Sequence, residues 1–167
     1  PGVGPRHLIL SDDDRHAYLL TEFTGEVIRF DRSEGGRLSR AEDVWFYDGA
    51  SGIQNSAYGW DPRKDHLIWG ADLAIACGGR WLLCTERTES TVGAVELTPK
   101  GHLSDHVVLS KVEAQPRSLT VAPGGDLVVV VGELSDHAGL YRLEADGRLT
   151  ELDRIHTGKG PNWVRFA

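Results

Sequence analysis

The chain has 167 residues and a formal net charge of −7, with 25 acidic against 18 basic residues, which argues against nucleic acid as a partner because such binding surfaces are basic. It contains no run of about 18 apolar residues, so no transmembrane helix is expected. The two cysteines, Cys77 and Cys84, have no metal-binding or redox spacing, so we expect neither a metal nor another cofactor, and they fit a reducing cytoplasm.

Short apolar runs separated by turn residues predict three successive groups of four antiparallel strands. The first group is expected at residues 6–10, 15–22, 26–31 and 38–46. The second is expected at residues 72–76, 80–87, 91–97 and 103–109. The third is expected at residues 117–121, 127–132, 139–143 and 149–156, and residues 161–166 are predicted to open a further group. Turn sequences such as Ala122-Pro123-Gly124-Gly125 separate the strands, because proline presets φ and glycine permits positive φ.

Two sequence markers repeat with a period of about 45 residues. Pro116-Arg117-Ser118 returns 45 positions later as Pro161-Asn162-Trp163, and Pro5-Arg6-His7 is an earlier copy. Gly101-His102-Leu103 and Gly147-Arg148-Leu149 keep nearly the same spacing, 46 positions. A repeat of ~40–50 residues that is rich in strands and poor in helix is typical of β-propeller blades.

The second strand of each group is apolar on both faces, as in Trp81-Leu82-Leu83-Cys84 and Val128-Val129-Val130-Val131. A strand covered on one side only would alternate between apolar and polar residues. The middle strands of a propeller blade are instead covered twice, by the blades on either side. A β-sandwich with buried central strands is the alternative, but it would not show a 45-residue repeat, so we predict an all-β propeller with four-stranded antiparallel blades.

These assignments give one propeller domain over residues 1–167. Its blades lie at about 5–47, 71–110 and 116–157, the inner strand of a further blade lies at 161–167, and an insertion occupies 48–70. Closed propellers have about 4–8 blades, so three and a fraction cannot close a ring. The sequence also contains no methionine and begins within a blade. We therefore expect the C-terminal part of a longer protein, whose N-terminal half completes the propeller.

Polar residues occupy two matched positions at one end of the predicted blades. The first strands begin at Arg6, Asp72, Arg117 and Asn162, and the second strands end at Glu22, Arg87 and Glu133. Antiparallel pairing brings these positions to one edge of each blade, so they should ring one mouth of the central channel. Three arginines with the single carboxylate of Glu22 are an unbalanced set that would accept an anion. Asp72 and Glu133 are the members most easily explained as salt bridges between blades.

The insertion at residues 48–70 is expected to cross this mouth, because a blade's fourth strand ends at the rim and the next blade's first strand begins near the axis. A long loop over a polar cavity is a candidate lid, and a surface loop without a role in the site is an equal alternative. The insertion contains three aromatic residues, Tyr58, Trp60 and Trp69. Arg63 and Lys64 at its turn could attract anions or simply be solvated.

Short motifs along the chain occur in a characteristic order. They are Gly4-Pro5-Arg6-His7, Thr21-Glu22, Trp69-Gly70-Ala71-Asp72-Leu73, Cys84-Thr85-Glu86-Arg87, Gln115-Pro116-Arg117 and Gly158-Lys159-Gly160-Pro161-Asn162-Trp163-Val164. With these motifs the chain resembles the seven-bladed propeller lactonase family, in particular its bacterial 6-phosphogluconolactonases. The resemblance implies a ring of seven four-stranded blades, hydrolysis of the lactone of 6-phosphogluconate, and a final strand that N-terminal strands complete. The family also includes fungal carboxymuconate lactonising enzymes, and both substrates are anionic.

The resemblance further implies catalytic roles for Arg6, Glu22 and Arg117, together with a histidine of an earlier blade that would lie upstream of Pro1. The chain departs from the family at Ala74, where members often have histidine, so any role of that histidine is lost here. We assign Glu22 as the general base or as the group that orients the upstream histidine, and Arg6 and Arg117 as clamps for an oxyanion or a phosphate. The remaining candidate substrate contacts are Arg87, His7, Asp72 and Asn162.

The predicted function is therefore the cytoplasmic hydrolysis of 6-phosphogluconolactone, a small anionic substrate, without metal or cofactor. Lactone hydrolysis needs a positioned water, a base for its proton, and cations beside the developing oxyanion. One alternative is a lactonising enzyme that acts on a carboxylated muconate with the same arginines. Another is a propeller that binds a partner and catalyses nothing, because a fold does not fix a function.

Overall fold

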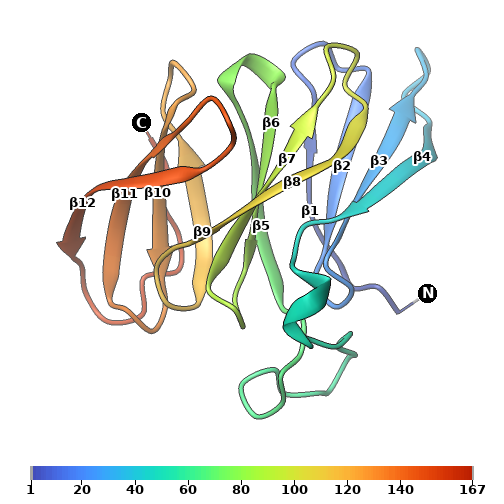
Figure 1. The fold of residues 1–167 in the computed structure, drawn as a ribbon. Coiled ribbons are helices and arrows are strands. Elements are labelled where there is room, and N and C mark those ends of the chain that lie inside the picture. The colour runs from blue at the N-terminus through green and yellow to red at the C-terminus, as the bar shows by residue number, and fades with distance from the viewer. Residues whose placement is uncertain (1, 167) are drawn as a thin grey trace.

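The computed structural model describes residues 2–166, which form three four-stranded antiparallel sheets standing side by side (Figure 1). The first sheet contains β1 (Pro5–Leu10), β2 (His16–Thr21), β3 (Glu26–Arg32) and β4 (Leu38–Trp45). The second contains β5 (Gly70–Ala76), β6 (Trp81–Glu86), β7 (Thr91–Leu97) and β8 (Leu103–Lys111). The third contains β9 (Pro116–Val121), β10 (Leu127–Gly132), β11 (His137–Leu143) and β12 (Leu149–His156). Each strand pairs with the next along the chain, which confirms the predicted four-stranded blades.

The sequence patterns locate the strands closely but shorten some of them. The bounds predicted for β7, β10 and β12 are those observed. β5 and β11 begin two residues earlier than predicted and β8 ends two residues later, because Gly70 pairs with Glu86, His137 with Gly132, and Lys111 with Thr91. The cross-strand ladder therefore extends through residues that read locally as strand ends. Two 3₁₀ turns, η1 (Gly49–Ser51) and η2 (Cys77–Gly79), complete the elements, and no helix within residues 2–166 has the length and apolar character needed to cross a membrane.

The expected opening strand at residues 161–166 is not formed. These residues have no regular secondary structure, and Ala167 lies outside the described part of the chain. A strand requires a hydrogen-bond ladder, and no described strand pairs with this segment, so the inner strand of a further blade stays a prediction. Side chains from Trp163 to Arg165 nevertheless line a cavity together with β1, β5 and β9, so the segment does run along the inner strands.

Two apolar clusters fill the spaces between successive blades. Leu82 and Cys84 of β6 pack into the cluster shared with the first blade, while Trp81 and Leu83 pack into the cluster shared with the third. All six residues of β6 are buried, since neighbours cover both faces of the pleated strand. The central blade is thus a wedge between two others, as the doubly apolar second strands predicted.

The inner strand β5 lies between β1 and β9, and the residue that begins β5 closely approaches the residue that ends β2. A Cβ atom at Gly70 would lie 2.5 Å from the main-chain oxygen of Thr21, closer than any side chain tolerates. Glycine at this position lets the first and second blades meet there. The insertion that joins β4 to β5 lies at the same end of the sheets (Figure 1).

Candidate active site

We call the end of the sheets where β5 begins the mouth. Each inner strand has an irregularity in its pairing there. The register of β1 against β2 skips between Pro5 and His7, and that of β9 against β10 skips between Pro116 and Ser118. The register of β5 against β6 skips between Gly70 and Leu73. Such bulges place two residues opposite one and re-aim the side chain of the extra residue. Arg6, Arg117 and the pair Ala71-Asp72 fall in these bulges, which is the local reason that the matched positions differ from ordinary strand residues.

The structure brings Arg6, Glu22 and Arg87 together, as predicted from their repeat positions. Glu22 Oε1 accepts a hydrogen bond from Arg87 Nη2 at 2.6 Å and lies 3.8 Å from Arg6 Nε. Arg6 Nη1 also donates to the main-chain oxygen of Ala71. Glu22 thus joins arginines from two neighbouring blades, and residues 65 positions apart in the sequence meet at one carboxylate oxygen.

Arg87 is the most deeply buried of these groups, with a side chain only 2% exposed. Its guanidinium donates to the main-chain oxygens of Trp69 and Gly70 as well as to Glu22. Burial and, to a smaller extent, the positive charge of Arg6 lower the pKa of Arg87 to about 10, against the opposing effect of Glu22. With its donors directed at these acceptors, Arg87 holds Glu22 in place.

Trp69 is a site residue to which the sequence analysis assigned no role, although it is aromatic and begins one of the family motifs. Its indole Nε1 donates to Glu22 Oε1 at 3.0 Å, and the guanidinium carbon of Arg87 lies 3.6 Å from the ring centroid. Its main-chain N–H donates to the buried carboxylate of Glu86 at 2.8 Å. Burial raises the pKa of Glu86, opposed by three main-chain donors. The available signal was the position of Trp69 immediately before an inner strand that begins at the mouth.

The insertion reaches the site through its C-terminal end and not through its exposed aromatics. Tyr58 is 94% exposed, and Trp60 also lies largely in solvent. The insertion is anchored by buried Ile53, Leu67 and Ile68 and by a bridge between Gln54 and Leu67. Arg63 stacks on Trp69, with 4.5 Å between the guanidinium carbon and the ring centroid. In this arrangement the insertion supports Glu22 from the side, and Tyr58 and Trp60 do not cover the mouth.

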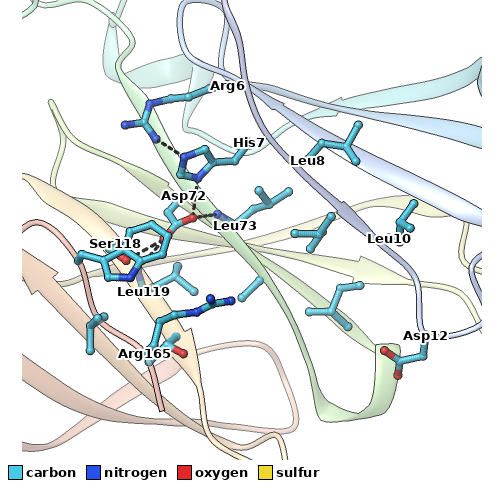
Figure 2. A pocket seen from close by; sticks show the side chains of 16 residues that line it. Arg6, His7, Leu8, Leu10, Asp12, Asp72, Leu73, Ser118, Leu119 and Arg165 are labelled. Atoms are coloured by element: carbon cyan, nitrogen blue, oxygen red, sulfur yellow. Dashed lines mark hydrogen bonds and ion pairs between the residues drawn. The ribbon is translucent and has the colours of Figure 1, made fainter. Parts of the chain in front are cut away.

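His7 and Asp72 form a second contact between the first and second blades. His7 Nδ1 lies 2.8 Å from Asp72 Oδ1, and His7 Nε2 lies 3.2 Å from Arg6 Nη1 (Figure 2). Asp72 is itself fixed, because its Oδ2 accepts from Ser118 Oγ at 2.9 Å and from the main-chain N–H of Leu119 at 3.2 Å. Asp72 therefore joins all three blades at the mouth.

Arg117 pairs with Glu133 of its own blade. Arg117 Nη1 lies 3.2 Å from Glu133 Oε1, and Gln115 donates to the other oxygen of that carboxylate. The Arg117 side chain remains about a third exposed, whereas Glu133 is more deeply buried. The expectation that Asp72 and Glu133 serve in pairs agrees with these contacts, although Glu133 pairs within a blade and not between blades.

The expected imbalance of charge is not found when the whole cluster is counted. The cluster contains three arginines and three carboxylates, so its formal charges balance. The carboxylates are those of Glu22, Asp72 and Glu133. The positive and negative groups differ instead in whether they line the mouth cavity, because Arg6 and Arg117 do so and the carboxylates do not. A cavity of about 220 Å³ at the mouth is lined by Arg6, His7, Arg117, Asn162 and Trp163, and within residues 2–166 no carboxylate forms part of its wall.

Burial lowers the pKa of Arg6, and Arg117 lowers it further while Glu22, Asp72 and Glu133 oppose the change. Two guanidiniums that repel each other across a small cavity are a receptive surface for an anion. A larger cavity of about 520 Å³ continues from Arg6 and His7 along the inner strands toward Asp12 and is lined by both polar and apolar side chains (Figure 2).

The fold and this mouth define a class of protein, namely a β-propeller with an anion-receptive pocket at one end of its inner strands. The family model described as Lactonase, 7-bladed beta-propeller matches residues 1–166, and the chain belongs to this family. The three sheets are accordingly three blades of a seven-bladed propeller.

Individual relatives agree with this assignment. The chain is 32% identical to the 6-phosphogluconolactonases of Blochmanniella pennsylvanica and Serratia proteamaculans over 98% of its length. It spans 45% and 46% of those proteins, which is under half of their length. Among solved structures, the periplasmic gluconolactonase of Pseudomonas aeruginosa superposes with a TM-score of 0.80 at 27% identity, over 96% of this chain and 42% of that protein.

Proposed function

We propose that the protein to which this chain contributes hydrolyses 6-phosphogluconolactone to 6-phosphogluconate, a step of the pentose phosphate pathway. The observation that carries the proposal is the wall of the mouth cavity, where Arg6 and Arg117 face inward and the carboxylates that pair with them lie behind. Membership of the lactonase family and the names of the curated relatives support the reaction type. Arg6 and Arg117 bind the phosphate or the carbonyl oxygen that becomes negative during attack by water.

The other residues of the mouth serve these two arginines. Glu22 orients Arg6 and is in turn held by Arg87 and Trp69. All of these contacts are made through its Oε1. Asn162 lines the cavity with a side chain that can both donate to and accept from a sugar hydroxyl.

Two sugar lactones are candidate substrates, one phosphorylated and one not. One solved relative is named for gluconolactone without a phosphate, whereas the curated relatives are named for the phosphorylated lactone. Each hydrolysis releases a proton, so one pH-indicator assay measures both substrates with the full-length protein, after subtraction of spontaneous hydrolysis. The proposal requires a higher kcat/KM for fresh 6-phosphogluconolactone. A preference for gluconolactone would reassign the substrate, and inactivity on both would refute lactone hydrolysis.

The partner and the compartment belong to the same proposal. The partner is the N-terminal half of the same propeller, which would cover apolar side chains that the end blades expose, such as Leu8 of β1 and Ile155 of β12. The compartment is the cytoplasm, since both Cys77 and Cys84 are free thiols, as is usual in a reducing environment. Fractionation of cells that express the full-length protein tests this location, and recovery in the periplasm would contradict it.

A further inference from the structure

We propose that His7 is the general base of this site and that Asp72 of the neighbouring blade holds it in the required tautomer. The inference rests on the proposed lactone hydrolysis and assigns its proton acceptor to His7 in place of Glu22 or a histidine of an earlier blade. His7 lines the mouth cavity itself, next to Arg6 and Arg117, whereas Glu22 does not reach its wall. A base must lie within hydrogen-bond reach of the water it activates, so position in the cavity favours the histidine.

Two independent contacts fix which nitrogen of His7 carries the proton. Nδ1 lies 2.8 Å from the Oδ1 of Asp72, and an ionised carboxylate only accepts hydrogen bonds, so Nδ1 carries the hydrogen. Nε2 lies 3.2 Å from Nη1 of Arg6, and a guanidinium only donates, so Nε2 presents its lone pair. The neutral ring is therefore held with its basic nitrogen on the side of the arginine and the cavity.

Asp72 is suited to hold this ring because it cannot easily move. Asp72 is 7% exposed. Its two carboxylate oxygens accept hydrogen bonds from the main-chain N–H groups of Leu73 and Leu119 and from the hydroxyl of Ser118. Its own main-chain N–H donates to Thr85 Oγ1 at 2.8 Å. The side chain of His7 is 35% exposed, so its other edge can meet solvent and substrate. A rigid buried carboxylate behind a partly exposed imidazole is the arrangement by which a histidine is kept oriented as a base.

The reaction then proceeds with its protons accounted for. A water donates to Nε2 and attacks the lactone carbonyl carbon, a C–O bond forms, and the water proton passes to Nε2. Arg6 turns the N–H that it gave to Nε2 toward the carbonyl oxygen, which becomes negative. When the ring C–O bond breaks, the imidazolium returns its proton to the departing ring oxygen, which becomes a hydroxyl. The new carboxylic acid loses its proton to solvent, so His7 ends the cycle neutral.

The experiment compares His7→Ala with wild type in the full-length protein, with and without added imidazole. The expected result is a fall in kcat of at least about 100-fold with a change in KM below about threefold, because general-base catalysis contributes about 10²–10⁴-fold. Imidazole should restore part of the lost rate, since truncation leaves space beside the cavity. Uncatalysed hydrolysis by imidazole is subtracted from each trace. His16→Ala is the matched control, because His16 also contacts an aspartate, Asp31 at 3.2 Å, at the opposite end of β2.

The pH profile supplies a readout that a structural role would not change. The charged groups that face the cavities lined by His7 are Arg6, Asp12, Asp72, Arg117 and Arg165. Wild-type kcat should fall toward acidic pH, as expected for catalysis by a general base, and His7→Gln should lose this acidic limb along with most of the rate. Asp72→Asn should lower kcat as well, with its melting temperature recorded because two main-chain N–H groups depend on the carboxylate.

Each outcome decides the assignment. Loss of kcat that imidazole repairs in His7→Ala, but not in His16→Ala, supports it. A His7→Ala variant that keeps its kcat within about threefold, loses activity only through KM, or gains nothing from imidazole overturns it while leaving the hydrolase proposal intact. Wild-type protein without lactonase activity would instead overturn the proposed function and this assignment together.

Discussion

Replacement of Glu22 by glutamine removes one negative charge from the contact that joins Arg6 and Arg87 and keeps the shape of the side chain. In the structure Glu22 Oε1 accepts from Arg87 at 2.6 Å and from the Trp69 indole at 3.0 Å, and it lies 3.8 Å from Arg6. Without the charge, Arg6 loses the group that orients it toward the cavity. We therefore expect the variant to lose turnover by more than its loss of stability would suggest.

The magnitudes follow from these contacts. A hydrogen bond to a charged group contributes about 1.5–3 kcal/mol, and glutamine retains an oxygen acceptor on a side chain that is partly exposed, so we expect a loss of about 1–2 kcal/mol in the free energy of unfolding. This corresponds to a fall of about 2–8 °C in melting temperature. Removing one donor to an oxyanion lowers kcat by about 10²–10³, and a misdirected Arg6 is a partial form of that loss, so we expect kcat to fall about 10- to 100-fold.

The assay measures kcat and the thermal midpoint of the full-length variant. Glu42→Gln is the matched control, because Glu42 is 31% exposed and pairs at 2.9 Å with a buried arginine, Arg29, away from the mouth. Both variants should lose stability, and only Glu22→Gln should lose turnover. A Glu22→Gln variant with wild-type kcat and a lowered midpoint would refute the reasoning and leave Glu22 as a salt-bridge partner.

Three further changes test other parts of the site. Arg117→Lys keeps the charge but loses the bidentate fork, so KM for 6-phosphogluconolactone should rise about tenfold; an equal rise for gluconolactone would show that Arg117 does not bind the phosphate. Trp69→Phe keeps the ring beneath Arg87 but removes the donor to Glu22, so kcat should fall about three- to tenfold, with exposed Trp60→Phe as the control and unchanged kcat as the contrary result. The 167-residue chain alone should associate and lack lactonase activity, because its end blades expose apolar side chains; sedimentation of an active 18.3 kDa monomer would contradict this expectation.

The sequence by itself determined the blades and the positions of the candidate site. Doubly apolar second strands and glycine-rich turns predicted where strands begin and end, because burial on two faces and positive φ are local requirements. The 45-residue repeat then placed Arg6 and Arg117 at equivalent points of successive blades. Equivalent points in a repeat lie at equivalent points in space, so the mouth cluster followed without any knowledge of side-chain contacts.

The tertiary structure alone decided which of these groups face the cavity and which are held by one another. The sequence predicts Arg6 and Arg87 at the same edge of the blades, one beginning a first strand and the other ending a second strand. In the structure Arg87 is buried among the carbonyl oxygens at the end of the insertion, and Arg6 is directed by a bulge toward the cavity. The role of Trp69 depends on its contact with Glu22, which lies 47 positions away in the sequence. The orientation of His7 depends on its contact with Asp72, which lies 65 positions away. The absence of a strand at residues 161–166 has the same origin, because a ladder requires a partner strand, and the local sequence of a segment does not specify which strands lie beside it.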